Sequence, residues 1–196
     1  MLQEMLEFAR APRVLVSAET FERLAAENDL LQLERTAEGH LVVLPPAGGQ
    51  TASFGAELTR QLGNWNARVG LGVCFDSSAG FTLSNGAIRS PDASWIRMER
   101  WASVREDLRE RFAPIDPDFA IELGSPSDSM REVRTKVRDY LECNVGLTWI
   151  INPRSQTVEV YRPGVAPETI RGARSIGAEP ELPGFVLDLR PIFDRL

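Results

Sequence analysis

The pattern that most constrains the fold of this chain lies between residues 118 and 151, where a helix pattern separates two strand patterns. The first strand pattern, DFAIEL (118–123), places Phe119, Ile121 and Leu123 on one face. The second, LTWII (147–151), is apolar throughout, which is typical of a strand buried on both faces. A strand, a helix and a strand in this order predict a βαβ crossover with parallel strands. We therefore expect an α/β fold in which helices flank a mixed sheet.

The helix between these strands is MREVRTKVRDYLE (130–142), and Ser125 and Ser127 are placed to cap its start. Lys136 flanks its apolar stripe and is the only lysine among the 22 Lys and Arg residues. Lysine is a compact point charge, whereas arginine is a wide, planar fork, so a lone lysine can mark a functional site. The alternative is an ordinary solvated helix position, because both residues are good helix formers.

The rest of the chain predicts one domain, 1–196, with an N-terminal extension (1–49) ahead of the core and C-terminal strands (50–196). The extension contains a helix capped by Ser17 and a hairpin over 31–44. A helix follows over 50–69, ended by Gly70. Antiparallel strands are expected at 73–76, 80–83 and 93–98, an exposed charged helix at 99–112, and further strands in the tail at 158–163, 168–172 and 183–189.

Composition excludes several classes of function. A net charge of −6 and a pI near 5.0 argue against a general affinity for polyanions. Cys74 and Cys143 lack metal or redox spacing, and no apolar run has the length of a signal peptide or a membrane span. We therefore expect a cytoplasmic protein with no membrane role.

Carboxylates are the strongest candidates for chemistry, because His40 is the only histidine and opens an apolar strand, where a structural role is expected. Asp92 precedes a strand in SPDASWI, and Glu122 ends the strand FAIEL. Two acids at strand ends, with a lysine on the next helix, suit a magnesium-dependent hydrolase of phosphodiesters. Alternatively, Asp92 is a strand-edge residue and Glu122 pairs with an arginine, and the spacing leaves both interpretations open.

The runs GFTLSNGAIRSPDASWIRMERW and DFAIELGSPSDSMREVRTKVRDYLECNVGLTWIINP, followed by VEVYRPG and LPGFVLDL, resemble the bacterial restriction-endonuclease family of the Uma-two type. The resemblance extends over nearly the whole chain from about Leu31. That family is assigned to the PD-(D/E)XK nuclease superfamily, so the resemblance implies a restriction-endonuclease-like sandwich. It also implies that Asp92 and Glu122 are the motif acids and that Glu57 is the acidic residue of the first core helix.

One position departs from the superfamily pattern. The usual catalytic lysine stands two residues after the motif acid, where this chain has Gly124. Some superfamily members are similar in carrying that lysine on the following helix, which implies that Lys136 takes the role here. The resemblance then implies Mg²⁺ or Mn²⁺ held by Asp92, Glu122 and the carbonyl of Leu123, with the attacking water between the ion and Lys136.

The resulting hypothesis is a metal-dependent endonuclease that cleaves DNA. A homodimer would present two sites to the two strands. A second hypothesis is a catalytically inactive nuclease-like domain that binds nucleic acid or a protein partner, which the acidic charge and Gly124 favour. A third is a structural homo-oligomer whose acids only pair with arginines.

Overall fold

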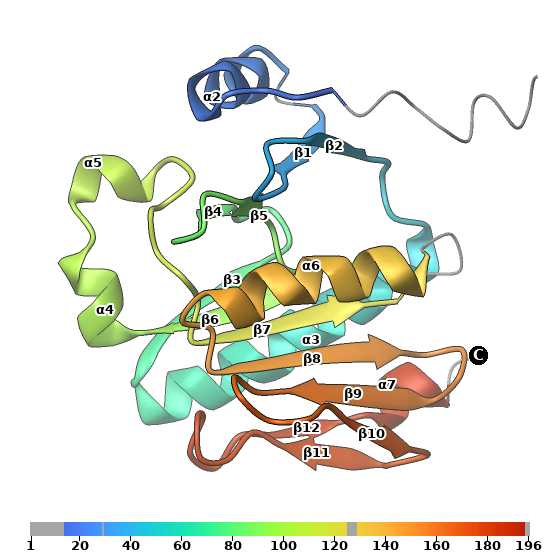
Figure 1. Cartoon of the computed structure of the whole chain (residues 1–196). Coiled ribbons are helices and arrows are strands. Elements are labelled where there is room, and N and C mark those ends of the chain that lie inside the picture. Colours follow the sequence, from blue (N-terminus) through green and yellow to red (C-terminus); the bar gives the residue numbers. More distant parts are fainter. Residues whose placement is uncertain (1–13, 29, 125–128, 195–196) are drawn as a thin grey trace, which may run out of the picture.

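The computed structural model describes residues 14–28, 30–124 and 129–194 of the 196, and it contains a mixed sheet flanked by helices (Figure 1). The predicted fold class is therefore confirmed. Its helices are α2 (Ala18–Glu27), α3 (Gly49–Val69), α4 (Met98–Ser103), α5 (Glu106–Arg109), α6 (Met130–Glu142) and α7 (Arg190–Phe193). Its strands are β1 (Gln32–Arg35), β2 (Leu41–Leu44), β3 (Gly72–Asp76), β4 (Phe81–Thr82), β5 (Ile88–Arg89), β6 (Ala93–Arg97), β7 (Phe119–Leu123), β8 (Leu147–Asn152), β9 (Thr157–Tyr161), β10 (Glu168–Arg171), β11 (Ser175–Gly177) and β12 (Val186–Asp188).

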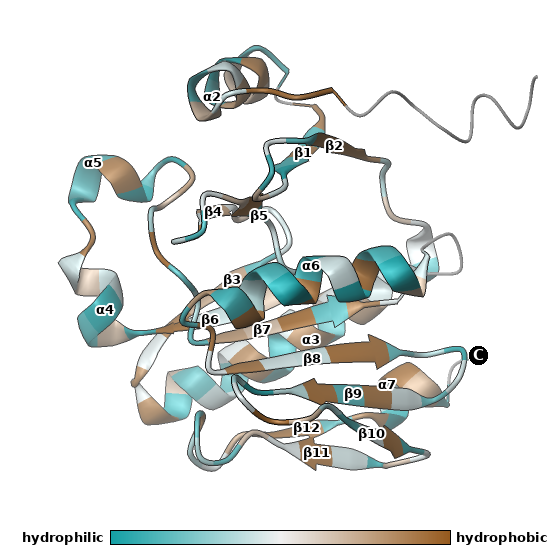
Figure 2. Ribbon diagram, viewed as in Figure 1, coloured by the Kyte–Doolittle hydropathy of each residue, from teal (hydrophilic) through white to brown (hydrophobic). Residues whose placement is uncertain are grey.

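The main sheet has six strands in the order β10-β9-β8-β7-β6-β3. Strands β7 and β8 are parallel, with Phe119 opposite Leu147, and α6 connects them as the predicted crossover. The other neighbouring strands of this sheet pair antiparallel. Figure 2 shows hydrophobic colouring along β8 and alternating polar and apolar turns along α6, as expected for a central strand and a surface helix.

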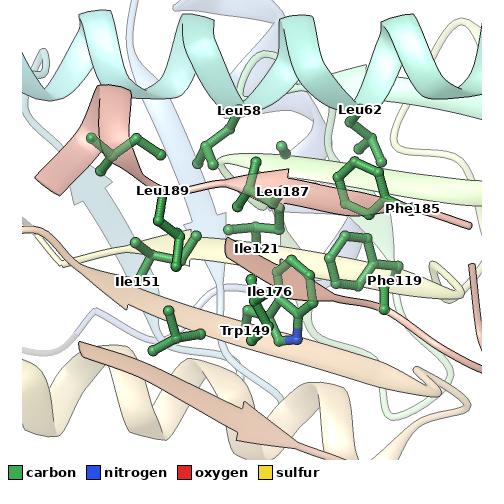
Figure 3. Close-up of a cluster of buried hydrophobic side chains, with 14 of the residues drawn as sticks. Leu58, Leu62, Phe119, Ile121, Trp149, Ile151, Ile176, Phe185, Leu187 and Leu189 are labelled. Atoms are coloured by element: carbon green, nitrogen blue, oxygen red, sulfur yellow. The ribbon is translucent and has the colours of Figure 1, made fainter. Parts of the chain in front are cut away.

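Helices α3 and α6 cover opposite faces of this sheet. Phe54, Leu58, Leu62 and Trp65 recur every three or four residues, so α3 presents one apolar face to the sheet. Gly70 ends this helix in the left-handed conformation, with φ of 66°, as the sequence predicts. Figure 3 shows side chains of α3, the central strands and the C-terminal segment packed into one core.

Strand β7 separates the two cores through its alternation. Phe119, Ile121 and Leu123 pack in the core beneath α3, whereas Ala120 packs with Val137 and Tyr140 beneath α6. Glu122 follows the alternation of Ala120 and therefore faces α6. The sheet thus directs a carboxylate toward the helix that carries Lys136.

A second sheet, of order β2-β1-β5-β4, joins the N-terminal hairpin to the segment before β6. Strand β1 pairs with β2 as the predicted hairpin, and Arg35 of β1 lies opposite Ile88 of β5. Helix α2, capped by Ser17, packs Phe21 against Leu33 and Ile88 in a small core of its own. The residues of the hairpin are therefore held next to those that lead into Asp92.

Two local features differ from the sequence expectations, and a third expectation falls outside the described residues. The charged stretch 99–112 does not form one helix, because Val104 adopts an extended conformation and separates α4 from α5. Of the expected strand 80–83, only Phe81 and Thr82 are extended, and they belong to the second sheet. Ser125 and Ser127, predicted to cap α6, lie outside the described residues. Within the described ranges, no helix has both the length and the apolar character that a bilayer span requires.

Candidate active site

Glu122 is the buried acid at the centre of the candidate site. It is the fourth residue of β7 and is 5% exposed. Its Oε1 accepts a hydrogen bond from the Tyr140 hydroxyl at 2.8 Å, and its Oε2 lies 3.0 Å from the Lys136 ammonium. Both carboxylate oxygens therefore contact donors from α6, which are four residues apart and so lie on the same face of the helix.

Asp92 lies beside Glu122, directly before the neighbouring strand β6. Strands β6 and β7 pair with Ala93 opposite Ile121, so Asp92, one residue before β6, is level with Glu122. The half-buried Asp92 accepts a hydrogen bond from the Leu123 backbone N–H through Oδ2 at 2.6 Å. The antiparallel register thus brings together two carboxylates that are 30 positions apart in the sequence.

Lys136 reaches both the acid on β7 and a second acid from the N-terminal hairpin. Its Nζ lies 3.0 Å from Glu122 Oε2, 2.7 Å from Glu34 Oε1 and 2.7 Å from the carbonyl oxygen of Ser90. The side chain is only 13% exposed, so it does not occupy an ordinary solvated helix position. Three acceptors converge on one nitrogen, which matches the three donors of an ammonium group.

This convergence gives a physical reason for the single lysine. The planar guanidinium spreads its donors over three nitrogens, so it cannot direct three N–H groups from one point. The negative charges of Glu122 and Glu34 raise the Lys136 pKa above its ordinary value, against the lowering effect of burial. Lys136 is therefore a compact, charged cation here, and a role that needs its neutral amine is disfavoured.

Glu34 is the residue that sequence reasoning missed. It lies on β1, is 1% exposed, and contacts Arg89 through Oε2 at 2.9 Å as well as Lys136. Arg89 in turn pairs with Asp139 of α6, also through its Nε at 2.8 Å. The only sequence signal was an acid inside the apolar hairpin pattern LQLER, and periodicity does not show which residue such an acid meets.

The electrostatics of the two glutamates differ. Burial raises the pKa of Glu122 to about 8, the Lys136 charge opposes that shift, and the charges of Asp92 and Glu34 add to it. Burial also acts on Glu34, but the charges of Lys136 and Arg89 outweigh it and lower the pKa of Glu34. The Tyr140 pKa is raised, first by burial and then by the negative charge of Glu122, so the phenol remains a hydrogen-bond donor at neutral pH.

Glu57 and Leu123 complete the set of predicted site residues. Glu57 lies on α3, on the opposite face of the sheet from α6, and accepts hydrogen bonds from Arg60 Nε and Gln61 Nε2, both at 2.9 Å. Leu123 ends β7, and its N–H is the group that Asp92 accepts from. The catalytic role of Glu57 and the metal-binding role of the Leu123 carbonyl stay predictions.

The carboxylate oxygens of Asp92 and Glu122 fit a metal ion that keeps several water ligands. Mg²⁺ is usually held by one or two carboxylates and keeps several waters, which suits the pair formed by Asp92 and Glu122. Among the residues that the structure describes, no group of three or more His, Cys, Asp or Glu side chains is placed to hold a metal. Such a set suits Mg²⁺ or Mn²⁺ and does not suit a structural zinc ion, which takes four protein ligands.

The arrangement of this sheet and its helices is shared with a solved structure. A solved structure described as a putative nuclease belonging to DUF820, from Anabaena variabilis, superposes with a TM-score of 0.71 at 22% sequence identity. The match covers 83% of this chain and 89% of that chain. No curated protein matches the chain significantly.

The family model of Uma2, described as "Putative restriction endonuclease", matches residues 18–190. The chain therefore belongs to the Uma2 family. The match begins at the start of α2, so it includes the hairpin that carries Glu34.

Proposed function

We propose that the protein is a metal-dependent endonuclease that hydrolyses phosphodiester bonds of DNA. Membership of the Uma2 family supports the nuclease class. The observation that carries the proposal is the strand register that brings Asp92, directly before β6, level with Glu122 of β7, with the Lys136 ammonium 3.0 Å from Glu122. Two carboxylates with one fixed cation are the parts that phosphodiester hydrolysis with Mg²⁺ requires.

In this proposal, Asp92, Glu122 and the carbonyl of Leu123 would hold Mg²⁺ or Mn²⁺. When bound, the ion would supply a water of lowered pKa and offset negative charge on the phosphate. Lys136 and Tyr140 fix the two oxygens of Glu122, so the carboxylate keeps one orientation. The Lys136 ammonium already contacts three acceptors, so it would reach a water or a phosphate oxygen only by exchanging one of them.

The test is nicking of supercoiled plasmid with Mg²⁺ or Mn²⁺ by the wild type, Asp92→Asn and Glu122→Gln. A matched control is Glu159→Gln, because Glu159 is also a buried glutamate beneath α6, paired with Arg134 and hydrogen-bonded by the Tyr161 hydroxyl. We expect metal-dependent nicking that both site variants lose and the control retains. Nicking that persists in Asp92→Asn and Glu122→Gln would contradict the proposal.

Metal location can be measured without activity, because Lys136 is the only lysine. In protein labelled with ¹⁵N at lysine Nζ, Mn²⁺ bound at Asp92 and Glu122 would broaden the single lysine resonance strongly. Asp92→Asn should reduce this broadening at the same Mn²⁺ concentration, and Glu159→Gln should not. Equal broadening in wild type and Asp92→Asn would place the metal elsewhere.

One observation favours the inactive domain as a second candidate. The three donors of Lys136 and both oxygens of Glu122 already have protein partners, so the hydrogen bonding of these two side chains is satisfied without a metal. Calorimetric titration with Mg²⁺ and Mn²⁺ separates the two candidates. Binding that depends on Asp92 supports the nuclease, whereas no binding together with no nicking of DNA supports the inactive domain.

The predicted homodimer belongs to the same proposal. Two copies related by a twofold axis would present two sites to the antiparallel strands of DNA. Light scattering of the protein alone and with a short duplex tests this, and a monomer in both states would contradict it.

A further inference from the structure

The N-terminal hairpin contributes a buried acid to the candidate site. Glu34 Oε1 lies 2.7 Å from Lys136 Nζ and accepts a hydrogen bond from the Ser90 backbone N–H at 3.0 Å. Glu34 Oε2 lies 2.9 Å from Arg89. A carboxylate that is 1% exposed and contacts three donors is fixed in one position, because moving it would leave buried charges unpaired.

The contacts of Glu34 reach two parts of the site at once. Ser90 donates its N–H to Glu34 and accepts from the Lys136 ammonium through its carbonyl at 2.7 Å. Ser90 stands two residues before Asp92. Glu34 therefore holds both the ammonium and the backbone segment that carries one of the two proposed metal ligands.

The charges around Glu34 alternate in sign along a continuous path. Asp139 pairs with Arg89, Arg89 with Glu34, Glu34 with Lys136, and Lys136 with Glu122. Glu34 is the member between the two cations, so its carboxylate allows Arg89 and Lys136 to lie in one buried cluster. A neutral side chain at this position would leave Arg89 with only Asp139 and Lys136 with only Glu122 as a charged partner.

We propose that Glu34 is a positioning residue that fixes the Lys136 ammonium against Glu122 and the Ser90 segment next to Asp92. The catalytic consequence rests on the proposed nuclease function, but the positioning itself does not. The hairpin that carries Glu34 is in this view part of the active site rather than an attachment to it. The variants Glu34→Gln and Glu34→Asp test this, with Glu159→Gln as the matched control.

The first readout is the lysine Nζ signal, which reports Lys136 alone. In the wild type we expect one resonance whose protons exchange slowly with water, because three acceptors hold them. In Glu34→Gln, loss of a charge-assisted hydrogen bond should speed this exchange roughly tenfold or more. In Glu34→Asp the charge remains but the side chain is shorter, so exchange should be intermediate, and in Glu159→Gln it should match the wild type.

The second readout is the kinetics of plasmid nicking. Glu34→Gln should lower kcat by roughly tenfold or more and leave KM for DNA nearly unchanged, because the residue acts on the site and not on DNA. Glu34→Asp should recover part of kcat. If Glu34→Gln and Glu34→Asp have equal thermal stability, a purely structural defect would not produce this recovery. If Glu34→Gln does not fold, the Glu34→Asp signal and its kcat alone decide the question.

Unchanged proton exchange of Lys136 in both Glu34 variants would overturn the proposal, whatever the nicking rate. Faster exchange in Glu34→Gln, with partial recovery in Glu34→Asp, would establish the positioning. If the Glu34 variants show that exchange pattern but the wild type does not nick DNA with either metal, the nuclease proposal fails and the positioning stands. The two failures are therefore distinguishable.

Discussion

Tyr140 and Glu122 face each other across the contact between α6 and β7, and the phenol donates to Glu122 Oε1 at 2.8 Å. Tyr140→Phe removes only that donor. We expect a loss of about 1–2 kcal/mol in the free energy of unfolding, because a buried carboxylate oxygen loses a partner. Urea unfolding measures the stability. Tyr161→Phe is the matched control, since the Tyr161 hydroxyl bonds Glu159, and it should leave metal-dependent nicking intact while Tyr140→Phe lowers it.

Lys136→Arg keeps the positive charge but replaces the point donor with a planar fork. The acceptors from Glu34, Glu122 and Ser90 converge on one nitrogen, so the guanidinium cannot satisfy all three. We expect metal-dependent nicking to fall by about a hundredfold or more, in the range lost when a catalytic electrostatic group is displaced, while the circular dichroism spectrum stays native. Full activity in Lys136→Arg would remove the lysine from the mechanism.

Arg89 and Arg134 allow a buried arginine and a half-exposed arginine, each paired with an acid, to be compared in one protein. Arg89 is 4% exposed and contacts Glu34 and Asp139, so Arg89→Met should cost about 3–5 kcal/mol by leaving two buried acids with less compensation. The Arg134 side chain is 50% exposed and pairs with Glu159, so Arg134→Met should cost less than about 1 kcal/mol. Equal losses in chemical denaturation would contradict the assignment of Arg89 to a buried network.

The lowered pKa of Glu34 predicts a stability change in acid. Lys136 and Arg89 face this carboxylate and outweigh the effect of burial, so Glu34 stays ionised in the folded protein at pH values where it is protonated in the unfolded chain. Its contribution is therefore complete above the unfolded pKa of about 4.3 and is lost as the pH falls through the lower folded value. Glu122, with a pKa of about 8, takes up its proton at higher pH, so Glu34 is the charged partner of Lys136 in mild acid.

The measurement is the difference in unfolding free energy between the wild type and Glu34→Gln at pH 6, 5, 4 and 3. The difference should be constant near pH 6 and shrink below about pH 4.3. A difference that instead grows toward acid would mean that the pKa of Glu34 is raised in the folded protein.

Most of the local structure and part of the candidate site could be predicted from sequence patterns. Helix α3 with its Gly70 end, the hairpin over 31–44 and the crossover from β7 through α6 to β8 all follow from periodicity and end signals, which depend on neighbouring residues. The resemblance to the Uma-two type family implied Asp92 and Glu122, and the lone lysine drew attention to Lys136. The structure brings these three residues together, and their catalytic roles remain to be measured.

The acid that completes the cluster could not be predicted from the sequence, because it comes from a distant part of the fold. Glu34 meets Lys136 because β1 pairs with β5, which holds the hairpin beside Arg89 and Ser90. The tertiary structure likewise separates α4 from α5. It also places Glu57 on α3, which covers the face of the sheet opposite to α6. Sequence patterns report which face of an element is apolar, whereas the partner of a buried charge depends on how distant elements pack, and no local pattern carries that information.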